Sequence, residues 1–231
     1  MKKSKTPSLT HQAIPEDSAG DIKKVAKGAG ISFIGSATGR GLSILCQIII
    51  ARFFGTEVFG LYTLGLVVLR ITELVARLGL DSGAMRFISM SRKDNAGKVK
   101  GILISASFIS FINGILIGGV IYLFAGFVSE SIFHKPALTD IIKTFALCVP
   151  FIATMTVTAT ASQGFHTTKY AVYIKDIIQP SANIALVILF VQLGYGISWV
   201  VNAFAISHVI ALLAGFYFIA NQFPEIREKT I

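Results

Sequence analysis

Residues 101–127 read GILISASFISFINGILIGGVIYLFAGF and contain no charged side chain. A helix needs about 20 consecutive apolar residues to cross the hydrocarbon core of a bilayer. A strand in a membrane barrel needs only about ten residues and alternates apolar with polar positions, which this run does not do. The run therefore predicts a transmembrane helix and excludes a β-barrel.

Five further apolar runs lie on either side of this one, over 28–53, 58–79, 138–161, 174–193 and 197–220. The 231-residue chain is 53% hydrophobic and 14% charged, with a mean hydropathy of +0.70. A soluble domain carries about 25% charged residues. We therefore expect an all-α, polytopic membrane bundle of six transmembrane helices. A polar tail over 1–27 should precede this bundle, which spans 28–221, and a second tail over 222–231 should follow it.

Basic residues are distributed unevenly between the two sides of this predicted bundle. Fifteen lie on one side: six before the first span, five between the second and third, Lys169 and Lys175 between the fourth and fifth, and two in the C-terminal tail. Lys135 alone lies on the other side. Because basic loops stay in the cytoplasm, we predict a multi-pass cell-membrane protein with both termini cytoplasmic. The net charge of +9 then reflects these loops and not a nucleic-acid partner.

Charged residues inside the spans are the candidates for function, because an ionised group at mid-bilayer costs roughly 2.5–3.5 kcal/mol. Arg40 lies near the middle of the first span among small residues, and that span has no acidic residue. Small neighbours let a backbone, water or a ligand come close. Arg40 is therefore a candidate substrate-binding residue. The alternative is an arginine that reaches the interface or pairs with a carboxylate on another helix.

The second span carries a row of alternating charges. Arg70, Glu73 and Arg77 lie there, with Asp81 just beyond, and spacings of 3, 4 and 4 place all four on one helix face. One interpretation is a self-neutralised structural ladder. The other is a polar stripe that lines a water-filled cavity and, together with Arg40, binds an anionic substrate, since guanidinium groups grip phosphate oxygens.

Two prolines fall within predicted spans, Pro150 in the fourth and Pro180 in the fifth. Each removes a backbone hydrogen bond, and such breaks are common in transporter helices. Glycines four residues apart, at Gly35 and Gly39 and in the third span, are typical of close helix packing.

No signature of enzymatic chemistry accompanies these features. The two cysteines, Cys46 and Cys148, lie far apart within apolar runs, and the four histidines show no ligand spacing. Phosphate-binding glycine loops and zinc motifs are missing from the sequence. We therefore expect no enzyme, no cofactor and no metal site.

Residues 26–89 read AKGAGISFIGSATGRGLSILCQIIIARFFGTEVFGLYTLGLVVLRITELVARLGLDSGAMRFIS. This stretch resembles the N-terminal segment of polysaccharide-transporter-type flippases, within the multidrug/oligosaccharidyl-lipid/polysaccharide superfamily. The parts that carry the resemblance are 35–40, 51–55 (ARFFG), 59–62 (FGLY), 78–80 (LGL) and 86–88 (RFI).

The resemblance implies one lobe of a two-lobed flippase that moves a lipid-linked oligosaccharide, carried on an isoprenoid pyrophosphate, through a central cavity. A second lobe on another chain, or a second copy, is then an expected partner beside the bilayer and the anionic glycan. A second hypothesis is a non-transporting membrane scaffold, or a truncated remnant, in cell-envelope glycan assembly. A third is half of a cation-coupled multidrug exporter, against which the cationic residues argue.

Overall fold

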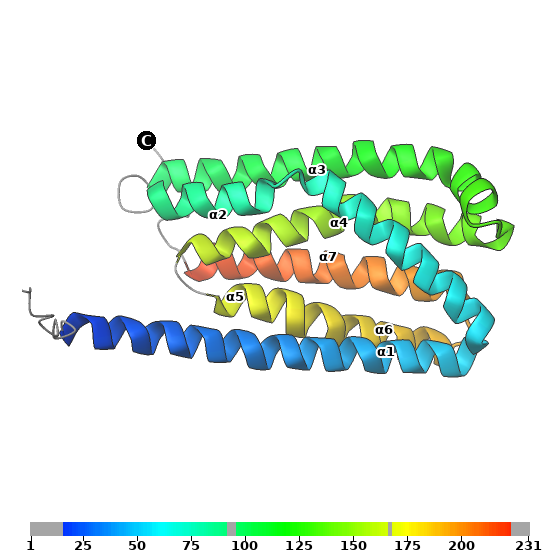
Figure 1. The fold of residues 1–231 in the computed structure, drawn as a ribbon, viewed down its shortest axis with the longest axis horizontal. Helices are drawn as coiled ribbons and strands as arrows, with labels where there is room; N and C mark the ends of the chain where they lie inside the picture. Colours follow the sequence, from blue (N-terminus) through cyan, green and yellow to red (C-terminus); the bar gives the residue numbers. More distant parts are fainter. Residues whose placement is uncertain (1–15, 92–95, 166–167, 223–231) are drawn as a thin grey trace, which may run out of the picture.

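A computed structural model describes residues 16–91, 96–165 and 168–222 of the chain. Within these ranges the chain is helical and contains no strand, which confirms the expected all-α fold (Figure 1). Five helical elements are long and apolar enough to cross a membrane. The first of them contains two spans, so the predicted number of six is confirmed.

The first two spans form a helical hairpin within the element α1 (Glu16–Arg77). At Gly55 the backbone has φ 79° and ψ 169°, outside the helical region. A positive φ of this kind suits glycine, which has no Cβ. The chain reverses direction there (Figure 1), so α1 consists of a first arm over 16–54 and a second arm over 56–77. The gap between the apolar runs 28–53 and 58–79 coincides with this turn.

A short helix follows the second arm, in the stretch expected to link the second and third spans. Leu78 and Gly79 both have positive φ, and they separate α1 from α2 (Leu80–Ser91). The buried face of α2, with Ala84 and Ile88, packs against α3 (Ala96–Phe127) and α4 (Thr139–Ala161). Segment 80–91 is therefore part of the packed bundle.

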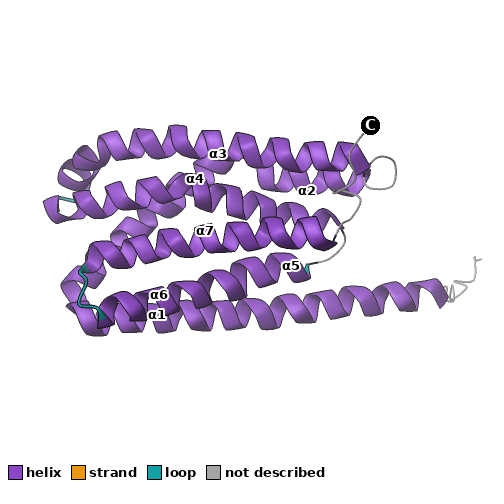
Figure 2. Cartoon of the chain, turned by 180° about the vertical axis from the view of Figure 1, so that it is seen from behind, coloured by secondary structure: helices purple, strands orange, loops and turns teal. Residues whose placement is uncertain are grey.

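The remaining spans run antiparallel to one another, with short turns at the bundle ends (Figure 2). A π-turn η1 (Val128–Ile132) and a 3₁₀ turn η2 (Pro136–Leu138) join α3 to α4, and η3 (Ser162–Phe165) follows α4. Span five is a continuous run of α5 (Lys169–Val172), the π-turn η4 (Tyr173–Ile178) and α6 (Gln179–Gln192). The last span is α7 (Ile197–Gln222).

Span five begins earlier than the sequence predicted, and this corrects one assignment. Helix starts at Lys169, whereas the apolar run starts at 174. Lys175 was counted with the link, although it is the second residue of the 174–193 run, and it lies inside the span, in η4. The basic count on the expected cytoplasmic side falls from fifteen to fourteen, and Lys135 still stands alone on the other.

Helix α4 is the centre of the bundle. It contacts α1, α3 and α7, and 16 of its 23 residues are buried. Phe145 joins it to neighbouring helices, because its ring lies 5.6 Å from that of Tyr62 and 5.8 Å from that of Phe204. Phe145 thus joins the second arm of α1 to α7.

Glycines allow two helix pairs to pack with their backbones in contact, as the glycine spacing predicted. A Cβ added to Gly118 of α3 would lie 2.6 Å from the carbonyl oxygen of Ala146, and one added to Gly114 would overlap Pro150. On the first arm of α1, a Cβ on Gly39 would lie 2.7 Å from the carbonyl oxygen of Asp176.

The carbonyl groups that Gly118 and Gly39 contact each lie four residues before a proline. Ala146 precedes Pro150, and Asp176 precedes Pro180, so in each case the N–H that would bond this carbonyl in an α-helix is missing. The two glycines thus lie against the two carbonyls whose α-helical donor the prolines remove. Helix α4 runs through Pro150, whereas the chain before Pro180 widens into the π-turn η4.

The described ends of the chain lie at the same end of the bundle. Figure 1 shows the start of α1 and the end of α7 on the same side, as an even number of spans requires. Residues 1–15 and 223–231, most of the two predicted tails, lie outside the described residues.

Candidate functional site

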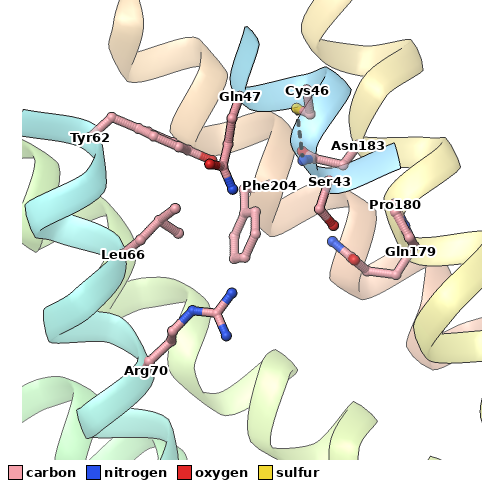
Figure 3. A pocket seen from close by; sticks show the side chains of 10 residues that line it. All are labelled: Ser43, Cys46, Gln47, Tyr62, Leu66, Arg70, Gln179, Pro180, Asn183 and Phe204. Atoms are coloured by element: carbon pink, nitrogen blue, oxygen red, sulfur yellow. Dashed lines mark hydrogen bonds between the residues drawn. The ribbon is translucent and has the colours of Figure 1, made fainter. Parts of the chain in front are cut away.

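A polar pocket of about 50 Å³ opens among both arms of α1, α6 and α7 (Figure 3). A cavity of this size has room for a few water molecules. Its lining consists mainly of polar and aromatic side chains: Ser43, Cys46, Gln47, Tyr62, Leu66, Arg70, Gln179, Pro180, Asn183 and Phe204.

Helical spacing brings these side chains together. On the first arm, Cys46 and Gln47 follow Ser43 by three and four residues, so they share one face. On the second arm, Leu66 and Arg70 follow Tyr62 by four and eight residues and share the facing surface. The first turn of α6 and Phe204 of α7 close the pocket.

Asn183 is the most buried amide of the lining, with 7% of its surface exposed. Its Nδ2 donates a hydrogen bond to Cys46 Sγ at 3.4 Å. Its Oδ1 is buried and has no hydrogen-bond partner among the described residues. An unpaired buried acceptor costs about 1–3 kcal/mol, and this oxygen is out of contact with solvent.

Gln179 connects the pocket to a second layer of polar residues on α7. Its Nε2 donates to Ser207 Oγ at 3.1 Å and lies 3.5 Å from His208 Nδ1. His208 is buried, and its Nδ1 lies 2.8 Å from the carbonyl oxygen of Phe204. Because a carbonyl only accepts, Nδ1 is the protonated ring nitrogen of this histidine.

Arg70, a predicted substrate-binding residue, belongs to this pocket. Its guanidinium group extends toward Phe204 and Gln179 (Figure 3). Within the described ranges, no carboxylate lies at ion-pair distance from it, and Glu73 pairs elsewhere. Arg70 thus presents its charge and its donors to the pocket.

Glu73 and Arg77 lie outside the pocket and form a ladder. Arg77 Nη1 bonds Asp81 Oδ2 at 2.8 Å, and Arg77 Nε lies 3.5 Å from Glu73 Oε1. Thr156 of α4 also donates to Glu73 Oε1, at 3.0 Å. The charge of Arg77 is therefore largely matched by its two neighbours, as in the ladder interpretation of the sequence.

Arg40 occupies a third position, on the exposed surface of the first arm beside the Gly39 contact. Ser36, one turn earlier, donates to Asp176 Oδ2 at 3.2 Å. No described carboxylate forms an ion pair with Arg40. The four predicted residues therefore do not converge: Arg70 lines the pocket, Glu73 and Arg77 form the ladder, and Arg40 stands apart.

Sequence reasoning missed two groups of polar residues. Lys175 donates to Thr160 Oγ1 at 2.8 Å inside span five, although its sequence position suggested a loop. The amides of the pocket, Gln47, Gln179 and Asn183, were passed over because only charged residues were sought within the spans. A search for amides next to Pro180 would have found two of the three.

The six apolar helices and the arrangement of the bundle define the class of the molecule as a multi-pass membrane protein. The chain matches the family described as "Polysaccharide biosynthesis protein" over residues 25–231. Because this match covers most of the chain, the protein belongs to that family, and the resemblance seen in residues 26–89 is confirmed.

A solved structure supports the same fold. The chain is similar, with a TM-score of 0.79 and 17% identity, to a multidrug resistance MATE family transporter of the MOP superfamily in an outward-facing conformation. The match covers 96% of this chain and 50% of the transporter, so the chain spans about half the length of that protein. The comparison with curated proteins finds no match. The expected helix bundle, equivalent to one lobe of a transporter, is confirmed.

Proposed function

We propose that this chain is one lobe of a membrane transporter that moves a lipid-linked oligosaccharide or polysaccharide unit across the cell membrane. Membership of a polysaccharide biosynthesis family and the likeness of the fold to half of a transporter support this proposal. Both termini lie in the cytoplasm, because the basic loops gather at that end. The second lobe comes from further sequence, another chain or a second copy.

The observation that carries the proposal is a pair of arginines, Arg40 and Arg70, that lie in membrane spans without a described carboxylate partner. An unpaired cation in a span is costly, and an anionic substrate would offset that cost. Arg40 binds the pyrophosphate, because its exposed guanidinium group can grip phosphate oxygens bidentately. Arg70 contacts the substrate from the pocket, and Glu73 and Arg77 form a second wall.

Binding of polyprenyl pyrophosphate to the chain in lipid nanodiscs tests this assignment. Arg40→Ala should weaken binding about tenfold or more, the loss of one or two charged hydrogen bonds. Arg40→Lys keeps the charge but loses the planar fork, so it should have an intermediate effect. Arg52→Ala is the matched control, because Arg52 is exposed on the same arm near the Gly55 turn.

Equal binding by wild type, Arg40→Ala and Arg52→Ala would contradict the proposed role of Arg40. Failure of the wild-type chain to bind polyprenyl pyrophosphate would favour the second candidate, a non-transporting scaffold in cell-envelope glycan assembly.

A further inference from the structure

A second pocket lies where the second arm of α1 begins, at the end of the bundle opposite the described chain ends (Figure 1). Its volume is about 490 Å³, within the range of pockets that hold small molecules. The first turns of the arm and one residue of the loop between η1 and η2 form the lining: Thr56, Glu57, Phe59, Gly60, Leu61, Thr63, Leu64 and Lys135. This pocket shares no residue with the polar pocket of Figure 3.

The wall of this pocket is apolar and firmly supported. Phe59, Leu61 and Leu64 are half-buried, and all three pack against the main hydrophobic core. A Cβ added to Gly60 would meet nothing within 4 Å, so the space beside this wall is open. Because apolar surface is excluded from water, hydrocarbon is the material that fills such a space at the end of a membrane span.

Two exposed side chains of opposite charge, Glu57 and Lys135, stand beside the apolar wall. Within the described part of the chain, neither forms an ion pair with the other or with a third residue. The backbone of Lys135 is held on both sides: its N–H donates to the carbonyl oxygen of Ser129 at 2.8 Å, and its own carbonyl accepts from the N–H of Leu138 at 3.0 Å. The pocket therefore offers one cation and one anion, each on an ordered segment.

This pair of charges selects the headgroup of a lipid ligand. An anionic headgroup, such as phosphatidylglycerol, would satisfy Lys135 but face the carboxylate of Glu57. A headgroup with a phosphate and an ammonium satisfies both. A primary ammonium carries three N–H donors for the carboxylate, whereas the quaternary ammonium of choline carries none. The chemistry therefore favours phosphatidylethanolamine over phosphatidylcholine.

We infer that this pocket binds one phosphatidylethanolamine molecule from the leaflet opposite the chain ends. Lys135 binds the phosphate, Glu57 accepts hydrogen bonds from the ammonium, and an acyl chain lies against Phe59 and Leu64. The site is distinct from the proposed substrate-binding arginines. Only the assignment to the outer leaflet rests on the proposed function, through its topology.

Competition between headgroups tests the site. The detergent-solubilised chain is given equal amounts of phosphatidylethanolamine, phosphatidylglycerol and phosphatidylcholine, all with palmitoyl and oleoyl chains, and native mass spectrometry measures which lipid stays bound. Wild type should retain mainly phosphatidylethanolamine. Glu57→Gln should lower its preference over phosphatidylglycerol about two- to fivefold, the effect of an exposed ion pair. Lys135→Gln should weaken both of these lipids. Glu130→Gln is the matched control, because Glu130 is exposed in η1 and does not line the pocket.

A second variant tests the apolar part without changing a charge. Gly60→Leu should fill the open space and lower retention of phosphatidylethanolamine about tenfold, and it should fold, since leucine is the better helix former. Gly119→Leu is its control, because a Cβ on Gly119 of α3 also meets nothing within 4 Å and this residue lies outside the pocket.

Equal retention of the three lipids by wild type would overturn the inference, as would a preference for phosphatidylglycerol. Retention of phosphatidylethanolamine by Gly60→Leu at the wild-type level would also overturn it. Since no polyprenyl pyrophosphate is used, the lipid site and the proposed function can fail separately.

Discussion

The contact between Gly39 and the π-turn gives a sharp test of how spans one and five are joined. In Gly39→Ala, the new Cβ would lie 2.7 Å from the Asp176 carbonyl oxygen and 2.8 Å from its Cα. Ordinary contact begins near 3.4 Å, so the helices must separate by about 0.7 Å. The opposing atoms belong to the backbone, so a change of rotamer cannot relieve the overlap. Overpacking of this kind costs about 1–3 kcal/mol.

Gly41→Ala, two positions later on the same arm, is the matched control. A Cβ on Gly41 meets nothing within 4 Å. Both variants gain the same helix propensity, about 1 kcal/mol over glycine, so the difference between them isolates the packing cost. At 2 kcal/mol, Gly39→Ala should unfold roughly 4–8 °C below Gly41→Ala, by the scaling for domains of this size.

The two buried, free cysteines provide the assay. Cys46 and Cys148 are inaccessible in the folded chain, so a thiol-reactive fluorophore labels them as the detergent-solubilised protein unfolds on heating. Equal midpoints for Gly39→Ala and Gly41→Ala would refute the backbone contact between the first arm and η4.

Three further outcomes are expected. In a variant without the native cysteines, single cysteines at Lys93 and Lys135 should be labelled from opposite sides of the membrane; labelling from one side would overturn the topology. Pro180→Ala should restore the missing backbone donor and narrow the π-turn. It should slow transport by a reassembled two-lobe complex more than it lowers expression. Unchanged transport would show that the proline is incidental. Arg77→Ala should lower the thermal midpoint more than Arg70→Ala does, because removing Arg77 leaves the carboxylates of Glu73 and Asp81 without their cation. The reverse order would contradict the ladder.

The spans themselves could be predicted because bilayer thickness fixes their length and composition. Segment 80–91 was harder, because α2 is a short amphipathic helix whose apolar face is recognisable only beside α3 and α4. Lys175 was misplaced because a basic residue at the edge of an apolar run was counted with the link, whereas its ammonium group bonds Thr160 inside the bundle. The polar pocket is formed by four helical segments that come together only in the folded chain, so no local sequence pattern predicts it.

The match between the prolines and the glycines also bears on how the chain enters the membrane during synthesis. The glycine always precedes its proline along the chain: Gly118 comes before Pro150, and Gly39 before Pro180. Synthesis runs from the N-terminus, so each glycine surface is already in the bilayer when the ribosome delivers the helix whose carbonyl lacks its α-helical donor. The opposite order would leave a bare peptide oxygen waiting in lipid, where every backbone group must be satisfied within the protein. If the earlier span stays beside the translocon until the later one arrives, each carbonyl packs against its glycine surface at once and is not exposed to lipid.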